Sequence, residues 1–132
     1  MALSCAGFLW NGITYGQGVT LPRASASAKV EQTVGISTIA INYSRPSVIS
    51  PQGQDRTGNI WGGIVPYGYN NLGFGTATEA PWRAGANENT TITFSHNAQV
   101  EGESIPAGTY GLHVAVMEDG QATVIFSNKT EA

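Results

Sequence analysis

Apolar and polar residues alternate through the last third of the chain. The run 109–117 places an apolar residue at every second position. These residues are Tyr110, Leu112, Val114 and Val116. Because successive side chains of a strand point to opposite faces, this period of two predicts a strand with one buried face. A shorter run, 90–95, predicts a second strand with Ile92 and Phe94 directed inward.

Turn signals connect these strands into hairpins. Glu-Asp-Gly at 118–120 predicts a tight hairpin turn of the primed kind, because Asp-Gly supplies the positive φ values that such a turn needs. The run 121–127 is then the returning strand. A shorter hairpin is predicted over 99–105, with its turn at Gly102.

The first half of the chain has a weaker period. Residues 29–34 and 36–43 predict two strands broken at Gly35. Pro46 is expected to end the second strand, since proline cannot donate to a ladder. Residues 24–28 are small and show no strong period, so we expect them to lead into the first strand without belonging to it.

A long connection rich in glycine and proline separates the two halves. It consists of a polar loop at 47–58, an apolar segment at 59–68 and a second loop at 69–81. Because glycine and proline interrupt the apolar segment, we expect a tight, buried loop there and no regular strand.

Together these elements predict an all-β protein, since no helical period persists over ten residues. The chain has 132 residues, 17 Gly, 6 Pro and a hydrophobic fraction of 41%, which suits one domain with a modest core. We therefore expect a single-domain β-sandwich or jelly-roll-like fold over residues 19–132, with short strands and long Gly/Pro-rich loops.

Charge and cysteine content exclude several classes of protein. The chain has six Lys and Arg residues, no basic stripe and a formal net charge of −3, so we exclude a nucleic-acid partner. Its single cysteine, Cys5, excludes an internal disulfide framework and a multi-thiolate zinc site. No apolar run reaches the roughly 18 residues that a transmembrane helix needs, so we expect no membrane span.

The N-terminal segment 1–18 has two interpretations. Residues 2–15 are largely apolar and are followed by Gly-Gln-Gly, as at the end of a secretory leader. No Lys or Arg precedes the apolar run, and Asn11 and Gly12 interrupt it. The segment is either the remnant of a signal peptide or an amphipathic N-terminal strand.

The run 82–90 concentrates polar chemistry beside a predicted strand. It places Trp82, Arg83, Asn87 and Glu88 within seven residues of a chain in which 11% of residues are charged. Loops that enter a sheet are where β-proteins hold binding groups on a rigid scaffold. This run is therefore the main candidate for a binding site.

The chain contains five motifs that, in this order, carry a resemblance to a known family. They are Leu21-Pro22-Arg23-Ala24-Ser25, Tyr43-Ser44-Arg45-Pro46, Ile60-Trp61-Gly62-Gly63-Ile64-Val65-Pro66-Tyr67-Gly68, Trp82-Arg83-Ala84-Gly85-Ala86-Asn87-Glu88 and Pro106-Ala107-Gly108-Thr109-Tyr110. Over roughly residues 20–128 the chain resembles a bacterial, mostly exported family, domain of unknown function 2911. The resemblance implies a periplasmic or secreted location and no particular activity. In that family the domain continues past the strand matching 123–127. The resemblance therefore implies a C-terminal truncation with an open sheet edge here, and either a fragment or a homo-oligomer that fills the gap.

Seven residues of these motifs form one hypothetical ligand pocket. They are Arg45, Trp61, Tyr67, Trp82, Arg83, Asn87 and Glu88. An arginine fork suits an anion, and aromatic faces suit sugars or rings. The alternative is structural: Arg83 and Glu88 pair with each other, and Asn87 satisfies backbone groups of the loop.

Catalytic and metal chemistry have little support. His96 and His113 have no neighbouring ligand motif, so we expect them to be exposed or satisfied and expect no metal site. No nucleophile elbow occurs, and we assign neither catalytic residues nor a cofactor. Glu88 would serve as a general base only if burial raised its pKa.

Three functions follow, in order of preference. The first is a non-enzymatic module that binds a small anion or saccharide. The second is a structural or assembly module of the cell envelope, which pairs through open sheet edges. The third is a hydrolase with Glu88 as its general base.

Overall fold

The protein is all-β, as the sequence predicts. The computed structural model describes residues 21–71, 73 and 77–131. In these residues the regular elements are β1 (Ser25–Val34), β2 (Ser37–Pro46), the 3₁₀ turn η1 (Thr57–Asn59), β3 (Thr91–Phe94), β4 (Ala98–Val100), β5 (Glu103–Ile105), β6 (Gly108–Val116) and β7 (Ala122–Ser127). The predicted N-terminal segment 1–18 lies outside the described residues.

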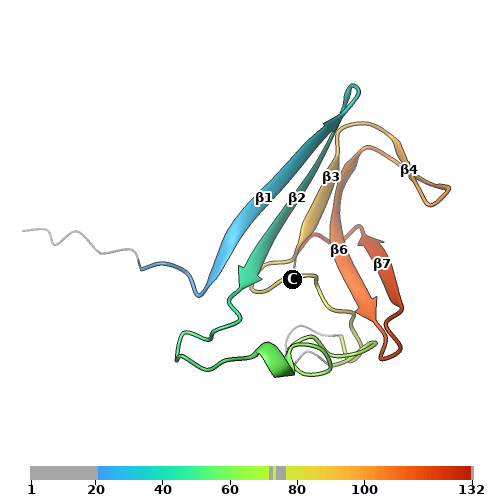
Figure 1. The fold of residues 1–132 in the computed structure, drawn as a ribbon. Helices are drawn as coiled ribbons and strands as arrows, with labels where there is room; N and C mark the ends of the chain where they lie inside the picture. The colour runs from blue at the N-terminus through green and yellow to red at the C-terminus, as the bar shows by residue number, and fades with distance from the viewer. Residues whose placement is uncertain (1–20, 72, 74–76, 132) are drawn as a thin grey trace, which may run out of the picture.

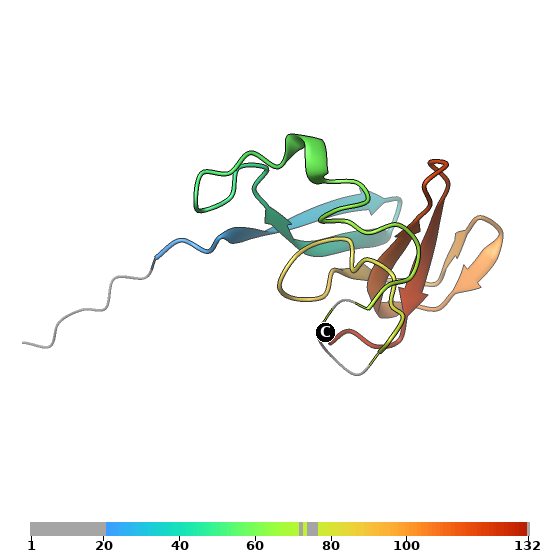
Figure 2. The ribbon, with the colours of Figure 1, turned by 90° about the horizontal axis from the view of Figure 1, so that it is seen from below.

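Five strands form one antiparallel sheet in the order β1-β2-β3-β6-β7, and β4 and β5 form a separate two-stranded sheet (Figure 1). Neighbouring strands of a sheet are rotated by about 20–25°. The accumulated twist turns β6 and β7 well away from the direction of β1 and β2 (Figure 2). The two sheets are thus unequal in size, and the larger one contains five of the seven strands of the described residues.

The strand β1 begins earlier than its own residues predict. It starts at Ser25 and pairs with β2 without interruption from Ser25↔Pro46 to Val34↔Ser37. The small residues 25–28 have little strand propensity, but the backbone of β2 offers them a continuous partner. Pairing therefore decides the start of β1, while Pro46 ends β2 as expected.

The β6–β7 turn differs from the primed turn that Asp-Gly predicts. The residues between Met117 and Gln121 form a three-residue loop, closed by a bond from Met117 N to Gln121 O. Gly120 has a φ of 88°, whereas Asp119 does not have a positive φ. This is the pattern of a type I turn followed by a left-handed glycine. The Asp119 carboxylate accepts a hydrogen bond from Gln121 N instead of adopting the left-handed conformation itself.

Register places the large apolar residues of β2, β3 and β6 on one face of the sheet. Ile41 lies opposite Ile92, and Ile92 lies opposite Tyr110. Phe94 is 4% exposed and makes edge-to-face contacts with Tyr110 and Phe126, with centroid separations of 6.3 and 6.0 Å. The core is therefore centred on β3, β6 and β7.

The apolar segment 59–68 is less buried than its composition suggests. Val65 is buried at 5% exposure, but Trp61, Ile64 and Tyr67 are 58%, 43% and 37% exposed. The segment lies at the end of the sheet, where β2 and β6 diverge, and not across the middle of a face (Figure 1). At that end its apolar side chains have fewer neighbours.

In the described residues there is no helix long and apolar enough to span a membrane.

Candidate functional site

The run 82–90 joins the two diverging parts of the sheet. Because β3 is four residues long, β2 and β6 both extend beyond its first residue. The loop lies in the gap: Trp82 O accepts from Val114 N at 2.8 Å, and Ala86 N donates to Ser44 O at 2.9 Å. The run 82–90 therefore has a structural task, which is to connect β6 to β2.

This loop has a constrained backbone. Ala84 and Asn87 have φ values of 53° and 59°, in the left-handed region that non-glycine residues rarely adopt. A Cβ added to Gly85 would lie 2.7 Å from Thr90 Oγ1 and 3.0 Å from Ser44 O. The close approach to β2 requires glycine at this position.

Glu88 is held by an arginine from outside the predicted cluster. Arg23 Nη2 donates to both carboxylate oxygens, at 2.6 and 2.7 Å, and Ser44 Oγ donates to Oε2 at 2.9 Å. The bond from Arg23, followed by those from its own backbone and from Ser44, lowers the pKa of Glu88 from 4.5 to about 2. The general-base hypothesis needs the opposite shift, so its premise is wrong.

An open cavity of about 360 Å³ lies beside this ion pair. It is lined by residues of the β1–β2 hairpin, by Arg23 before β1 and by the end of the 82–90 loop. Register places Ser27 opposite Ser44 and Lys29 opposite Asn42, so these four side chains share a face. The polar groups that line the cavity include Arg23, Ser27, Lys29, Asn42, Ser44 and Glu88.

Asn89 also lines the cavity and is 9% exposed. Its amide nitrogen donates to Lys129 O at 3.4 Å, while its amide oxygen is buried with no partner among the described residues. A buried acceptor left unpaired costs roughly 1–3 kcal/mol. Asn89 thus carries a buried acceptor that no described group satisfies.

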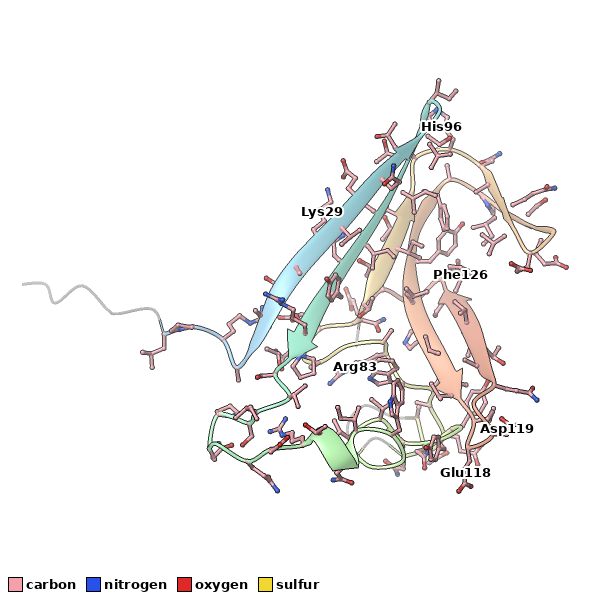
Figure 3. The ribbon with its side chains drawn as sticks, in the orientation of Figure 1. Lys29, Arg83, His96, Glu118, Asp119 and Phe126 are labelled. Atoms are coloured by element: carbon pink, nitrogen blue, oxygen red, sulfur yellow. The ribbon has the colours of Figure 1, made fainter. Side chains whose placement is uncertain are left out.

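The seven predicted site residues do not all meet at this cavity. Of the seven, Glu88 lines it. Arg45 follows Ser44 in β2, so its side chain points to the opposite face of the sheet. Asn87 is exposed next to Glu88, and Arg83 is half-buried in the loop that spans the gap (Figure 3).

The aromatic members form a second group. Trp61 packs edge-on against Trp82, with ring centroids 6.4 Å apart and an interplanar angle of 84°. Tyr67 lies against Gly62, where an added Cβ would lie 2.7 Å from the tyrosine ring. With Trp61 58% exposed, this group packs on the end of the sheet and still presents an aromatic surface.

The two histidines are far apart in the fold. His96 follows β3 and its Nδ1 is 2.9 Å from Ser95 Oγ. His113 lies in β6, where burial lowers its pKa and a hydrogen bond to the Gly111 backbone opposes that shift. Within the described ranges, no group of three or more His, Cys, Asp and Glu residues is placed to hold a metal ion.

The residues that sequence reasoning missed are Arg23 and the polar side chains of β1 and β2. A signal for the latter was present, because polar residues alternate along both strands at Ser27, Lys29, Asn42 and Ser44. These four side chains can be placed on one face only when the strand register is known. The contact of Arg23 with Glu88, 65 positions away, has no local signal.

Comparison with known proteins adds a family assignment. A family model described as protein of unknown function (DUF2911) matches residues 25–132. No match was found among curated proteins or among solved structures. The matched region contains all seven strands and most of the cavity, and covers well over half of the chain. This chain therefore belongs to the DUF2911 family.

Proposed function

We propose that this domain is a non-enzymatic module that binds a small saccharide in the β1–β2 cavity. The observation that carries the proposal is the set of four polar side chains, from two paired strands, on one face beside the Arg23–Glu88 pair. A sheet holds such groups in fixed positions, so little ordering would be needed when a ligand binds.

The charges favour a sugar over a small anion. Arg23 already gives its Nη2 to Glu88, and Lys29 pairs with Glu31 at 2.6 Å. The cavity therefore offers no uncompensated cation cluster. Instead it offers the hydroxyls of Ser27 and Ser44 and the amide of Asn42, which both donate and accept hydrogen bonds as sugar hydroxyls require.

Glu88 has an orienting role in this proposal. Its low pKa keeps it ionised at neutral pH, and an ionised carboxylate accepts charge-assisted bonds from ligand hydroxyls. Arg23 and Ser44 fix its position. A fixed acceptor gives specificity for hydroxyl geometry without any bond being broken.

A thermal-shift screen against neutral and acidic sugars, followed by calorimetry, tests the proposal. Asn42→Ala removes one hydrogen-bonding group from the cavity and should weaken binding by about three- to tenfold. Gln32→Ala is the matched control, because Gln32 belongs to the same hairpin but lies outside the lining and bonds the adjacent Thr33 O. A sugar that binds both variants equally, or a screen with no ligand, contradicts the proposal.

Two further elements of the proposal stay predictions. The first is stacking at Trp61, which the same screen tests with Trp61→Ala. If that variant loses binding and Asn42→Ala does not, the site is the aromatic surface and not the cavity.

The second element is a periplasmic or secreted location, for which the apolar N-terminal sequence is the support. Cell fractionation of the untagged protein tests it.

A further inference from the structure

The strand β1 is a long, unprotected sheet edge. It extends for ten residues with no proline and no break in its pairing, and β2 is its one sheet neighbour among the described residues. Every second residue of an antiparallel edge strand directs its N–H and C=O away from the sheet. Proteins block such edges with short strands, bulges, proline or charge. Of these devices, β1 has charge alone.

The charged residues of β1 are two residues apart and share one face. Lys29 Nζ lies 2.6 Å from Glu31 Oε2, and the side chains are 55% and 48% exposed. In antiparallel pairing with an identical strand, a two-fold axis at Lys29 would oppose two lysines, and one at Glu31 would oppose two glutamates. An axis at Val30, halfway between, opposes each lysine to a glutamate. Opposite charges across a strand pair stabilise it, and like charges destabilise it.

We propose that β1 pairs edge to edge, antiparallel, with β1 of a second copy, with Val30 on the two-fold axis. Lys29 then faces Glu31 of the partner subunit, and this contact occurs twice because the interface is symmetric. The residues 26–34 of the two strands pair along their whole length. Two five-stranded sheets become one continuous sheet.

Exposure along β1 fits this arrangement. Val30 is 54% exposed and lies on the apolar face, opposite Ile41. In the dimer it meets Val30 of the partner subunit, which shields apolar surface on that face. In Figure 3, Lys29 lies on β1, away from the loops at the end of the sheet. Lys29 also lines the cavity, but the pairing rests on the edge strand and its charges and needs no ligand.

Charge reversal tests the register. Sedimentation velocity over a range of concentrations should show a monomer–dimer equilibrium for the wild type, which rising salt weakens. Lys29→Glu or Glu31→Lys alone should weaken the dimer by about tenfold, because two attractive pairs become repulsive. An equimolar mixture of the two single variants should restore it as a heterodimer, although neither chain has its internal ion pair.

Cross-linking tests the position of the axis. In a Cys5→Ser background, Val30→Cys should form an intermolecular disulfide, since directly opposed residues have Cα atoms about 4.5–5.5 Å apart. Gln32→Cys is the matched control. It lies on the same face but would be displaced from its counterpart by four residues, so it should not cross-link.

Three results would each overturn the proposal. They are a protein that stays monomeric at every concentration, single charge variants that dimerise as well as the wild type, and a Gln32→Cys protein that cross-links as readily as Val30→Cys. Circular dichroism of every variant excludes unfolding as the cause, because the substituted side chains are exposed and should leave the fold intact.

Discussion

The two halves of the five-stranded sheet differ in how they are held. On one side, β3, β6 and β7 surround Phe94, and the connecting loops bond to β6 through Trp82 O and Gly68 N. On the other side, most of the β1 residues are exposed, and β2 contributes two buried residues, Ala40 and Ser44. The same sheet thus contains a packed half and an open half.

The difference indicates a division of tasks. The packed half supplies most of the burial that stabilises the domain. The open half has little core to protect, so its side chains can be polar on one face and its edge can remain available. Both proposals, the saccharide cavity and the β1 pairing, lie in this half.

The largest expected effect is a difference in unfolding free energy between two apolar truncations, one in each half of the sheet. Phe94→Ala should reduce the free energy of unfolding by about 3–5 kcal/mol, because it removes a buried ring that contacts two others. Val30→Ala should cost less than about 1 kcal/mol, because Val30 is half-exposed at an edge. Chemical denaturation, at a concentration where the protein is monomeric, measures both. Equal losses of unfolding free energy in the two variants would contradict the division into a packed and an open half.

An intermediate effect is expected where the loop joins the two halves. Gly85→Ala should lower the free energy of unfolding by about 1–3 kcal/mol, since the added methyl would press on Thr90 Oγ1 and on the backbone of Ser44. Gly58→Ala is the control, because an added Cβ there meets nothing within 4 Å. If both variants have the same midpoint of denaturation, the loop does not approach β2 as closely as described.

The smallest effect concerns Glu88 and depends on pH. Its folded-state pKa of about 2 lies below the ordinary 4.5, so its contribution to stability is present above pH 4.5 and is lost as the pH falls through 2. Glu88→Gln should therefore melt slightly below the wild type at pH 7, by about 1–3 °C for an exposed pair. The difference should shrink as the pH falls through 2 and vanish below it. A difference that persists there would mean that the effect is not due to charge.

Much of the fold could be predicted from local patterns. The period of two located β3 and β6, and Gly102 marked the β4–β5 turn, where Glu101 and Gly102 have φ values of 51° and 86°. The start of β1 and the type of the β6–β7 turn could not be predicted, because both depend on a partner strand. Burial of 59–68 was overestimated, since composition does not reveal that the segment lies beyond the end of the sheet.

The candidate site depends on contacts that are not visible in the sequence. Glu88 lines the cavity, but its partner is Arg23, which only the folded chain brings near. Strand alternation separates Arg45 from the cavity face although it is adjacent to Ser44. Which side chains converge is decided by register and sheet order, and neither can be read from a single sequence.

Native-state hydrogen exchange tests the division of the sheet most directly. In dilute protein, the amides of β3 and β6 should exchange only through global unfolding, whereas those of β1 should exchange through local opening at a much lower free energy. Raising the protein concentration should then slow exchange in β1 and leave β6 unchanged. Uniform protection across all five strands in the dilute protein would contradict the account.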